Sequence, residues 1–415
     1  MGASRRRRVL FIGELITLSH MARPATLAKT LDPAQYDVVF ACDHRHISLL
    51  DHDHHMKLVP LTSRMADKSM EAMAIGAEPF YDYEMLEQYI HEDLALFDAY
   101  APDVVVGDMR QSLLISSRLR KIPFVNIQNS YWHPDSDTFY DSPVSPWTHL
   151  LGEPWGRWLY NGVVNACLPF TLLPVHMACI RYGLPIVGLD FKDILSYGDF
   201  TVFPDIPELS PLDHVPEHTA YVGSCIWSPM SPEPEWWHAL PEHQPIIYVS
   251  LGSSGQPRLL TTILQALARI PATLIISTSS RAAITSRSEH VYVADYLNGL
   301  EAARRARVVI CNGGSTAAHQ SLAAGTPVLG IASNMDQTAS MRGIVARNAG
   351  EMILEMQLTE DTVHDAVWRL MSSPMYHQAA RALSQIINHF DTAQAFNAVM
   401  DQIFAGLPST TYAPR

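Results

Sequence analysis

The chain has 415 residues, too many for one ordinary hydrophobic core, and its length suggests roughly two or three domains. Hydrophobic residues make up 47% and charged residues 17%, so the chain can bury enough apolar surface to fold and is not a disordered protein. A formal net charge of -13 argues against a general nucleic-acid binder, because such proteins are usually basic.

The five cysteines are scattered, without the spacing of a zinc site or a disulfide framework. They are typical of buried thiols in a reducing compartment, so we expect a cytoplasmic protein. Four arginines, Arg5 to Arg8, precede the apolar run Val9 to Ile12, which is too short for a signal-peptide core or a membrane span. We expect the arginines to flank a first strand; the alternative is contact with anionic lipid.

Short apolar runs alternate with helical stretches through the first half of the chain. The pattern predicts strands at 9–13, 36–41, 102–108 and 123–127, and helices at 24–31 and 112–120. Such alternation is typical of parallel βαβ units, and continuous Val and Ile runs fit strands that are covered on both faces.

Seven prolines between residues 211 and 245 indicate a connection between domains. The alternation then resumes, with strands expected at 246–252, 273–277, 291–293, 308–311 and 328–331. The fold class is therefore α/β, with two doubly wound Rossmann-like domains. We expect these domains at 1–215 and 216–385, and a C-terminal helix within 386–415 that packs back toward the first domain.

The stretch from Trp147 to Pro185 is rich in Trp, Leu, Val and Phe. Its simplest interpretation is a buried helix pair in the first domain. The alternatives are the wall of an apolar substrate pocket and a surface that contacts a membrane peripherally.

Two loops in the second half have the composition of an anion site. Cys311 to Thr316, with two glycines and two hydroxyl residues, lies between a strand and a helix. Glycines allow a close approach of the backbone, and the free N–H groups of a helix start attract an anion. Ser250 to Gly255 follows the strand at 246–249 and offers similar groups. Neither loop is a dinucleotide fingerprint or a Walker loop.

The segment from Tyr296 to Gln337 resembles the donor-binding signature of family 1 glycosyltransferases, the UDP-glycosyltransferase superfamily, in its bacterial form. Its signature positions fall at matching spacings without a gap, at Asn312, Gly314, Gly325, Pro327, Asp336 and Gln337. The resemblance implies the GT-B fold, in which two Rossmann-like domains face each other across a cleft. The first domain would bind an acceptor and the second a nucleotide-sugar donor.

The resemblance also implies donor-binding roles. The donor diphosphate would be held by Gly313, Gly314, Ser315, Thr316 and the facing Ser253. Asp336 and Gln337 would bond sugar hydroxyls, and Leu297 would offer backbone groups to the base edge. Several donor-side positions depart from the family: Asn312 replaces a phosphate-binding His, Tyr296 a base-stacking Trp, and Gln320 a ribose-binding Glu. Asn298 and Gly299 also replace the usual Pro-Gln.

His20, in Ser19 to Pro24, resembles the catalytic base in the family's Gly-His-x-x-Pro, although Arg23 occupies the usual proline position. An unperturbed histidine suits removal of a hydroxyl proton near neutral pH. Asp108 ends the strand at 102–107 and could orient the imidazole, as carboxylates do in catalytic triads.

Two histidine-rich runs, Asp43 to His46 and Asp51 to His55, look like metal ligands, but no anion loop adjoins them and we expect no metal or cofactor. Ser130 to Asp141 is a polar and aromatic loop after a strand. It is either an ordinary long loop or part of the acceptor site, with His133 at its rim.

Together these features predict an inverting, metal-independent hexosyltransferase of natural-product or lipid glycosylation. It would move a sugar from a UDP or dTDP donor to a hydroxyl of a hydrophobic small-molecule or lipid acceptor. The alternatives are a non-catalytic glycosyltransferase-like activator partner, a GT-B nucleotide-sugar epimerase and, least favoured, a Rossmann oxidoreductase.

Overall fold

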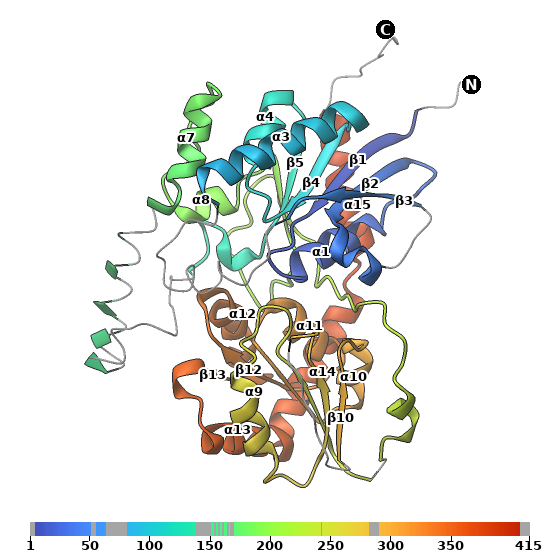
Figure 1. Ribbon diagram of the computed structural model, residues 1–415, viewed down its shortest axis with the longest axis vertical. Helices are drawn as coiled ribbons and strands as arrows, with labels where there is room; N and C mark the ends of the chain where they lie inside the picture. Colours follow the sequence, from blue (N-terminus) through green and yellow to red (C-terminus); the bar gives the residue numbers. More distant parts are fainter. Residues whose placement is uncertain are drawn as a thin grey trace.

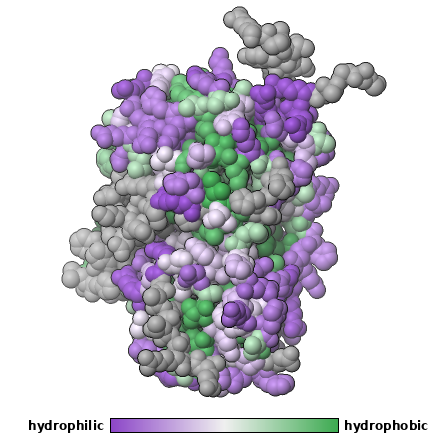
Figure 2. Space-filling model, turned by 45° about the vertical axis from the view of Figure 1, so that its right-hand side comes forward, coloured by the Kyte–Doolittle hydropathy of each residue, from purple (hydrophilic) through white to green (hydrophobic). Residues whose placement is uncertain are grey.

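Two parallel β-sheets, one above the other in Figure 1, organise the molecule. The computed structural model describes residues 5–50, 55–63, 81–137, 151–152, 155–156, 158–159, 162–163, 166, 170–241, 243–281 and 290–406. The surface is largely hydrophilic on the face drawn in Figure 2, with hydrophobic residues showing along its middle in both domains.

The first sheet has the strand order β3-β2-β1-β4-β5-β6-β7. Its strands are β1 (Arg7–Gly13), β2 (Tyr36–Asp43), β3 (Met56–Leu61), β4 (Val104–Asp108), β5 (Phe124–Ile127), β6 (Phe200–Phe203) and β7 (Thr219–Tyr221). The accompanying helices are α1 (Ser19–Ala28), η1 (His44–Leu49), α3 (Tyr83–Tyr100), α4 (Leu113–Arg120), η2 (Ser130–Trp132), α7 (Leu173–Arg181) and α8 (Phe191–Leu195).

Both faces of this sheet are buried, which explains the continuous apolar run in β1. Phe11 lies in the core that also contains Phe396 of the C-terminal helix, whereas Leu10 lies in the opposite core with Phe97 of α3 and Leu113 of α4. Alternate residues of one strand therefore serve two hydrophobic cores.

The second sheet has the strand order β10-β9-β8-β11-β12-β13. Its strands are β8 (Ile246–Ser250), β9 (Thr273–Ser277), β10 (Val291–Ala294), β11 (Val308–Cys311), β12 (Val328–Ala332) and β13 (Gly350–Leu354). The helices are η3 (Glu235–Ala239), α9 (Leu259–Leu267), α10 (Gly299–Arg305), α11 (Ser315–Ala323), α12 (Met335–Ala346), η4 (Glu355–Gln357), α13 (Glu360–Ser372), α14 (Pro374–His389) and α15 (Thr392–Gly406).

The strand order of each sheet reverses at one point, between β1 and β4 in the first and between β8 and β11 in the second. Open α/β sheets bind ligands in the crevice at the carboxyl ends of the strands at such a point. Gly13 and Asp108 are partners at the first reversal, and Ser250 and Cys311 at the second. The two predicted glycine-containing loops therefore follow the strands at the reversal of the second sheet. The predicted base follows a strand at the reversal of the first sheet; we call these two reversals the switch points.

The junctions between domains differ in detail from the expectation. β7 pairs with β6 in the first sheet, so the predicted boundary at residue 215 falls before the last strand of that sheet. After α14, the chain crosses back, and α15 places Phe396, Val399 and Met400 in the core of the first domain. The sequence prediction also missed β3, β6 and β13; β6 is only four residues long, and Pro60 in the edge strand β3 weakens its pattern.

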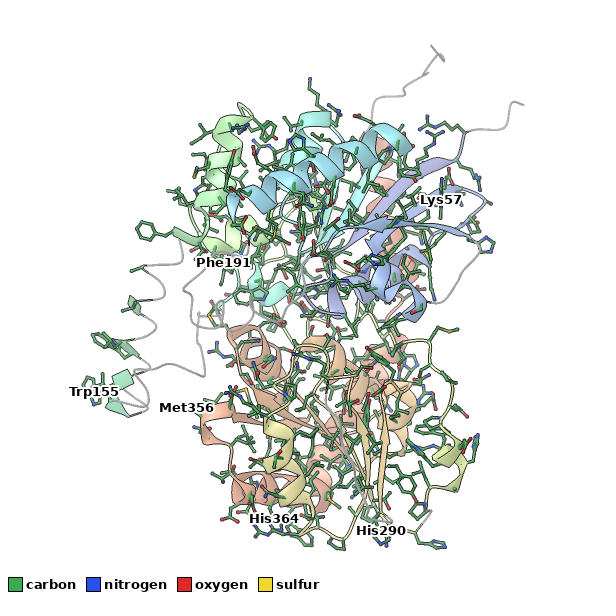
Figure 3. All side chains as sticks on the ribbon, viewed as in Figure 1. Lys57, Trp155, Phe191, His290, Met356 and His364 are labelled. Carbon is green, nitrogen blue, oxygen red and sulfur yellow. The ribbon has the colours of Figure 1, made fainter. Side chains whose placement is uncertain are left out.

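The apolar stretch around α7 is not the buried helix pair that the sequence suggested. Among its described residues, Trp155 and Trp158 are 69% and 72% exposed, and Phe170 is 73% exposed. Figure 3 shows Trp155 at the edge of the molecule, away from both sheets. On α7, Leu173, Met177 and Ile180 are also exposed, while Val175, Ala178 and Cys179 face the core.

Candidate active site

The carboxyl ends of the two sheets face each other and enclose a cleft of about 690 Å³, part of it open to solvent. Leu18 and Ser19, before and at the start of α1, line it from the first domain, and the two glycine-containing loops line it from the second. The backbone N–H of Leu18 donates to Ser253 Oγ at 3.0 Å, which joins the two domains at this point.

The two loops are held together by Asn312. Its Nδ2 donates to Ser254 Oγ at 2.8 Å, and its Oδ1 accepts from the Gly314 N–H at 3.2 Å. Gly313 has a φ of 80°, a left-handed conformation that favours glycine, and it turns the chain into α11. The N-cap residue of α11 is Gly314, which has no side chain to bind the first N–H groups of the helix, and such groups can bind an anion.

Seven of the predicted donor residues line the cleft: Ser253, Tyr296, Leu297, Asn312, Gly314, Thr316 and Gln320. Gly313 and Ser315 lie behind its wall; Gly313 faces Met341, and Ser315 is buried. The Gln320 side-chain amide is already engaged, because Nε2 donates to the carbonyl of Trp227 and to Ser228 Oγ.

Sequence reasoning missed part of this cleft. Trp227 and Pro229 line it from the proline-rich connection, and Ser277 lines it from the end of β9. A hydroxyl residue at the end of the strand next to β8 was a signal that could have found this serine. Nothing in the local pattern placed the connection against the cleft.

Asp336 and Gln337, in the first turn of α12, lie at the domain interface. Asp336 Oδ1 accepts from Tyr131 Oη and from Trp132 Nε1, both at 2.9 Å, so the loop after β5 contacts the second domain directly. The Gln337 side chain is buried; its Oε1 accepts from the Ser333 N–H at 2.7 Å, and its Nε2 has no partner within the described structure. A buried donor without a partner is uncommon in a folded protein.

The expected contact between His20 and Asp108 is present. His20 Nδ1 lies 2.8 Å from Asp108 Oδ1, and Asp108 is fully buried, whereas the His20 side chain is 17% exposed. His20 sits in the first turn of α1, which begins at Ser19 rather than near Pro24 as predicted, because Pro24 is accommodated inside the helix. The carboxylate is thus fixed in the protein while the imidazole reaches the solvent side.

Arg23 is the unexpected member of this group. Its Nε donates to Asp108 Oδ2 and its Nη2 to Asp108 Oδ1, both at 2.7 Å, and its Nη1 donates to Asn129 Oδ1. Burial disfavours the charged guanidinium, but the charge and hydrogen bonds of Asp108 outweigh it and raise the pKa of Arg23. Because Arg23 follows His20 by three helical residues, both side chains point to Asp108, and this spacing could have revealed it.

The polar network continues into the second domain. Asn129 Nδ2 donates to Asp205 Oδ1 at 3.2 Å, and His319 Nε2 of α11 lies 3.8 Å from the same oxygen. Burial lowers the pKa of His319. Buried polar groups therefore connect the surroundings of His20 with the helix whose start faces the cleft.

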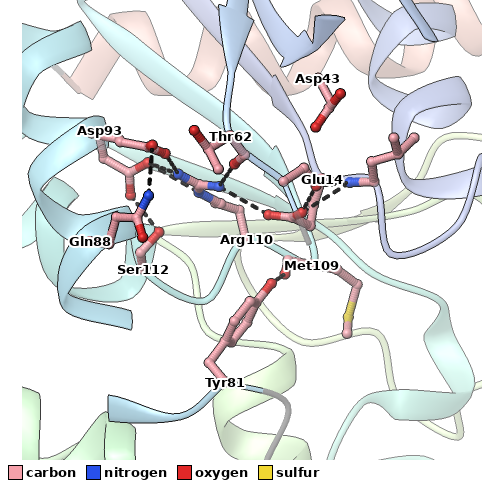
Figure 4. Close-up of polar contacts among 12 residues, drawn as sticks. Glu14, Asp43, Thr62, Tyr81, Gln88, Asp93, Met109, Arg110 and Ser112 are labelled. Atoms are coloured by element: carbon pink, nitrogen blue, oxygen red, sulfur yellow. Dashed lines mark hydrogen bonds and ion pairs between the residues drawn. The ribbon is translucent and has the colours of Figure 1, made fainter. Parts of the chain in front are cut away.

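A second buried cluster surrounds Arg110 (Figure 4). Its guanidinium donates to Glu14 Oε2 at 3.0 Å, to Asp93 Oδ1 at 3.2 Å and to Glu92 Oε2 at 3.1 Å. Burial raises the pKa of Glu14 to about 7, although the charge of Arg110 acts in the opposite direction. A left-handed φ of 55° at Met109 turns the chain between Asp108 and Arg110, so neighbouring residues serve different clusters.

The residues that resembled metal ligands form no such site where they are described. Asp43 is bound by Arg45, whose Nε and Nη2 donate to its two oxygens at 2.7 and 2.6 Å, and residues 51–54 lie outside the described residues. Across the described ranges, no group of three or more His, Cys, Asp and Glu could hold a metal ion. His133 packs against Phe203, and burial lowers its pKa.

Two facing Rossmann-like domains, with glycine-containing loops at the switch point of one and a His–Asp pair at that of the other, match the architecture of a GT-B glycosyltransferase. Residues 190–394 match the family described as UDP-glucoronosyl and UDP-glucosyl transferase. A PGL/p-HBAD biosynthesis glycosyltransferase of Mycobacterium tuberculosis is 40% identical over 385 residues, 92% of this chain and 89% of that protein. A PGL/p-HBAD biosynthesis rhamnosyltransferase of Mycobacterium bovis is 38% identical over 386 residues, 92% of this chain and 84% of that protein.

Solved structures agree on the fold. Spinosyn rhamnosyltransferase SpnG complexed with thymidine diphosphate has a TM-score of 0.65 at 18% identity, covering 95% of this chain and 100% of that chain. The chain therefore belongs to the UDP-glycosyltransferase family, and it is a glycosyltransferase with the GT-B fold. The resemblance predicted from the sequence is confirmed.

Proposed function

We propose that the protein is an inverting hexosyltransferase that moves a sugar from a UDP- or dTDP-linked donor to a hydroxyl of a hydrophobic small-molecule or lipid acceptor. The observation that carries this proposal is the His20–Asp108 pair at one switch point, next to a cleft lined by the anion-binding loops of the other. A base beside a leaving-group site is the arrangement that this reaction would need.

In the proposed reaction, His20 Nε2 takes the proton of the acceptor hydroxyl, while Nδ1–H donates to Asp108. The acceptor oxygen attacks the anomeric carbon from the face opposite the diphosphate, and the bond between that carbon and the diphosphate oxygen breaks. The charge that develops on the diphosphate is stabilised by the N–H groups at the start of α11 and by the hydroxyls of Ser253 and Thr316.

The donor sugar would lie against the start of α12. There the unpartnered Gln337 Nε2 can donate to a sugar hydroxyl, and Asp336 can accept from one. The base would stack on Tyr296 beside the backbone of Leu297. Because the amide nitrogen of Gln320 is engaged by Trp227, we expect Gln320 to bind the ribose through its carbonyl oxygen.

The names of similar proteins give indirect support for a nucleotide-sugar donor. One relative is named as a rhamnosyltransferase, and the similar solved structure holds thymidine diphosphate. These names favour a deoxysugar carried by dTDP over a UDP sugar, and the measurement below separates the two.

We further propose that the exposed apolar residues around α7 contact a membrane peripherally and bring the protein to a lipid acceptor. Leu173, Met177 and Ile180 share one face of α7, and the exposed Trp155 and Trp158 precede it. Trp and aliphatic residues on one helical face are typical of interfacial binding. Among the described residues, no helix is long and apolar enough to cross a bilayer.

A cytoplasmic location is proposed from the scattered cysteines.

The test is a transfer assay with UDP-glucose, UDP-glucuronate and dTDP-rhamnose as donors and a panel of phenols and lipids as acceptors. We expect acceptor-dependent nucleotide release and a product whose anomeric configuration, measured by NMR, is the opposite of that of the donor. His20→Ala should lose about 10²- to 10⁴-fold in rate and keep its donor affinity, because only the proton acceptor is removed.

His44→Ala is the matched control, since His44 also lies near an aspartate, Asp43, but is largely exposed and outside the cleft. Full activity of His20→Ala would overturn the assignment of the base. Donor binding without transfer to any acceptor would favour the non-catalytic partner, and conversion of the donor without acceptor would favour the epimerase.

A further inference from the structure

The proline-rich connection between the domains forms part of the wall of the cleft. Trp227 of this connection lines the cleft together with Tyr296 and Leu297, the residues proposed to bind the base of the donor. The Trp227 side chain is partly buried and also packs against the hydrophobic core of the first domain. One large aromatic residue of the connection therefore borders the cleft and contacts the first domain at the same time.

Three hydrogen bonds hold this part of the connection against the second domain. Gln320 Nε2 donates to the carbonyl of Trp227 and, at 3.2 Å, to Ser228 Oγ. Ser231 Oγ donates to the carbonyl of Tyr296 at 3.2 Å. Because Tyr296 and Gln320 line the same cleft, these bonds fix Trp227 at the end of the cleft that would receive the nucleoside.

Two residues that depart from the family signature make contacts with the connection. Gln320 stands where the family has a ribose-binding Glu, and an amide can donate to the Trp227 carbonyl, whereas an ionised carboxylate cannot. Asn298, in place of the usual Pro, accepts from Ser228 Oγ at 3.1 Å and from the Glu301 N–H at 3.2 Å. Both departures therefore supply polar groups that hold the connection beside the cleft.

The composition of the cleft gives an aromatic residue at this position a further role. The residues that the structure describes along the cleft carry no charged side chain, so contacts with the base have to supply a large part of the donor affinity. Tyr296 offers a smaller ring than the Trp on which the family stacks the base. Trp227 supplies an indole at this end of the cleft.

We propose that Trp227 is a donor-binding residue whose indole forms a second aromatic wall for the pyrimidine base, and that Gln320 holds it there through the backbone. The inference rests on the proposed nucleotide-sugar donor. Because Trp227 also packs on the core of the first domain, the bound nucleotide would contact a residue that both domains hold in place.

The test measures the binding of dTDP, UDP and inorganic pyrophosphate to the full chain by calorimetry. We expect Trp227→Ala to weaken the binding of the nucleotide that the wild type prefers by about 5- to 150-fold, the range found when an aromatic residue stacked on a base is replaced by alanine. Pyrophosphate binding should not change, because pyrophosphate has no base. Trp227→Phe keeps a ring and should retain most of the affinity.

Trp236→Ala is the matched control. Trp236 lies in the same connection, but its ring packs on Tyr292 and Trp237, with 5.3 and 5.9 Å between ring centroids, and it does not line the described wall of the cleft. This variant should bind nucleotides like the wild type. Wild-type nucleotide affinity in Trp227→Ala, or an equal loss of nucleotide and pyrophosphate affinity, would overturn the inference.

A second variant tests the contact that holds Trp227 and changes almost no volume. Gln320→Glu restores the residue of the family but removes the donor to the Trp227 carbonyl, so we expect it to weaken nucleotide binding several-fold. Equal or tighter binding would show that Gln320 does not hold the wall.

Tryptophan fluorescence provides a readout in the wild type. We expect dTDP or UDP to quench the emission of the wild type and of Trp236→Phe, and to quench that of Trp227→Phe much less. Equal quenching in both variants would overturn the inference. If the wild type binds neither nucleotide, the proposed donor fails and the inference fails with it; if the wild type binds one of them and Trp227→Ala binds it equally well, only the inference fails.

Discussion

One buried guanidinium, that of Arg110, faces three carboxylates, those of Glu14, Glu92 and Asp93. A single positive charge cannot balance all three in an environment with little water, and burial also raises the pKa of Asp93. Glu14 contacts Ser63 Oγ through its other oxygen, so a proton on Glu14 has an acceptor there. The cluster is most stable with a proton bound.

This cluster predicts a specific pH dependence of stability. The folded pKa of Glu14, about 7, lies above its ordinary value of 4.5, so its contribution to the free energy of unfolding is present below about pH 4.5 and is lost as the pH rises to about 7. Glu14→Gln removes this titration. We compare the free energy of unfolding of the variant with that of the wild type at each pH. We expect this difference to favour the variant more at pH 8 than at pH 5, by about 1–3 kcal/mol.

The measurement is urea unfolding at pH 5 and pH 8. Glu355→Gln is the control, since Glu355 pairs with an exposed arginine, Arg258, in the second domain. An identical difference between Glu14→Gln and the wild type at both pH values would contradict the prediction.

For single residues of the candidate site, the sequence predicted some positions correctly and missed others, and the difference has a physical reason. The glycine loops and the His20–Asp108 contact followed from strand ends, because chain order alone brings these together in a parallel sheet. In the sequence, Arg23 was only a departure from the family pattern. Its ion pair with Asp108 depends on the direction of its side chain, which the sequence does not give. The unpartnered nitrogen of Gln337 likewise becomes evident only from packing.

Among the elements, α7 carries the most unusual distribution of residues. Its inner face joins the core through Val175 and Cys179, and its outer face exposes leucine, methionine and isoleucine instead of charges. Exposed apolar patches of this kind usually mark a binding surface.

The element-scale prediction uses two methionines of equal exposure. Met177 on α7 is 46% exposed and Met375 on α14 is 47% exposed. We expect Met177→Glu to reduce co-sedimentation with phosphatidylcholine and phosphatidylglycerol vesicles several-fold, because a charge must be buried in the interface, whereas Met375→Glu should bind like the wild type. Equal binding by both variants, or no binding by the wild type, would exclude α7 as the membrane contact.

For the whole molecule, the important contacts are those that join the two domains across the cleft. Tyr131 and Trp132 of the first domain bind Asp336 of the second, the residue proposed to bind the sugar. Burial raises the pKa of Tyr131 well above its ordinary value, and the charge of Asp336 adds to this, so the phenol remains a hydrogen-bond donor. Under the proposed function, sugar binding and the contact between domains would share one carboxylate.

We expect Tyr131→Phe to raise the KM for the donor about three- to tenfold, because it removes one hydrogen bond, worth about 0.6–1.4 kcal/mol, that orients Asp336. Tyr221→Phe is the control; its hydroxyl donates to the carbonyl of Ser210 at 2.6 Å within the first domain. That variant should lose stability without a change in donor KM. Equal donor KM values for the two variants would contradict the role of the cross-domain bond.

The sequence predicted two Rossmann-like halves, because strand runs and helices alternate visibly in each. It could not predict how the halves meet, since the bonds from Tyr131 and Trp132 to Asp336 join residues more than two hundred positions apart. The sequence also wrongly placed the apolar stretch near α7 in the core. Hydrophobic composition alone does not show whether the rest of the fold offers a surface to cover such a stretch.

The return of α15 to the first domain has a consequence for how the protein is made. Phe396 packs against Phe11 with 6.2 Å between ring centroids, although almost the whole chain separates them. During synthesis, the core around Phe11 stays incomplete until α15 has left the ribosome, by which time the second domain has been made and can already fold. We therefore expect nascent chains that stop before α15 to expose the apolar face of β1 and to depend on chaperones.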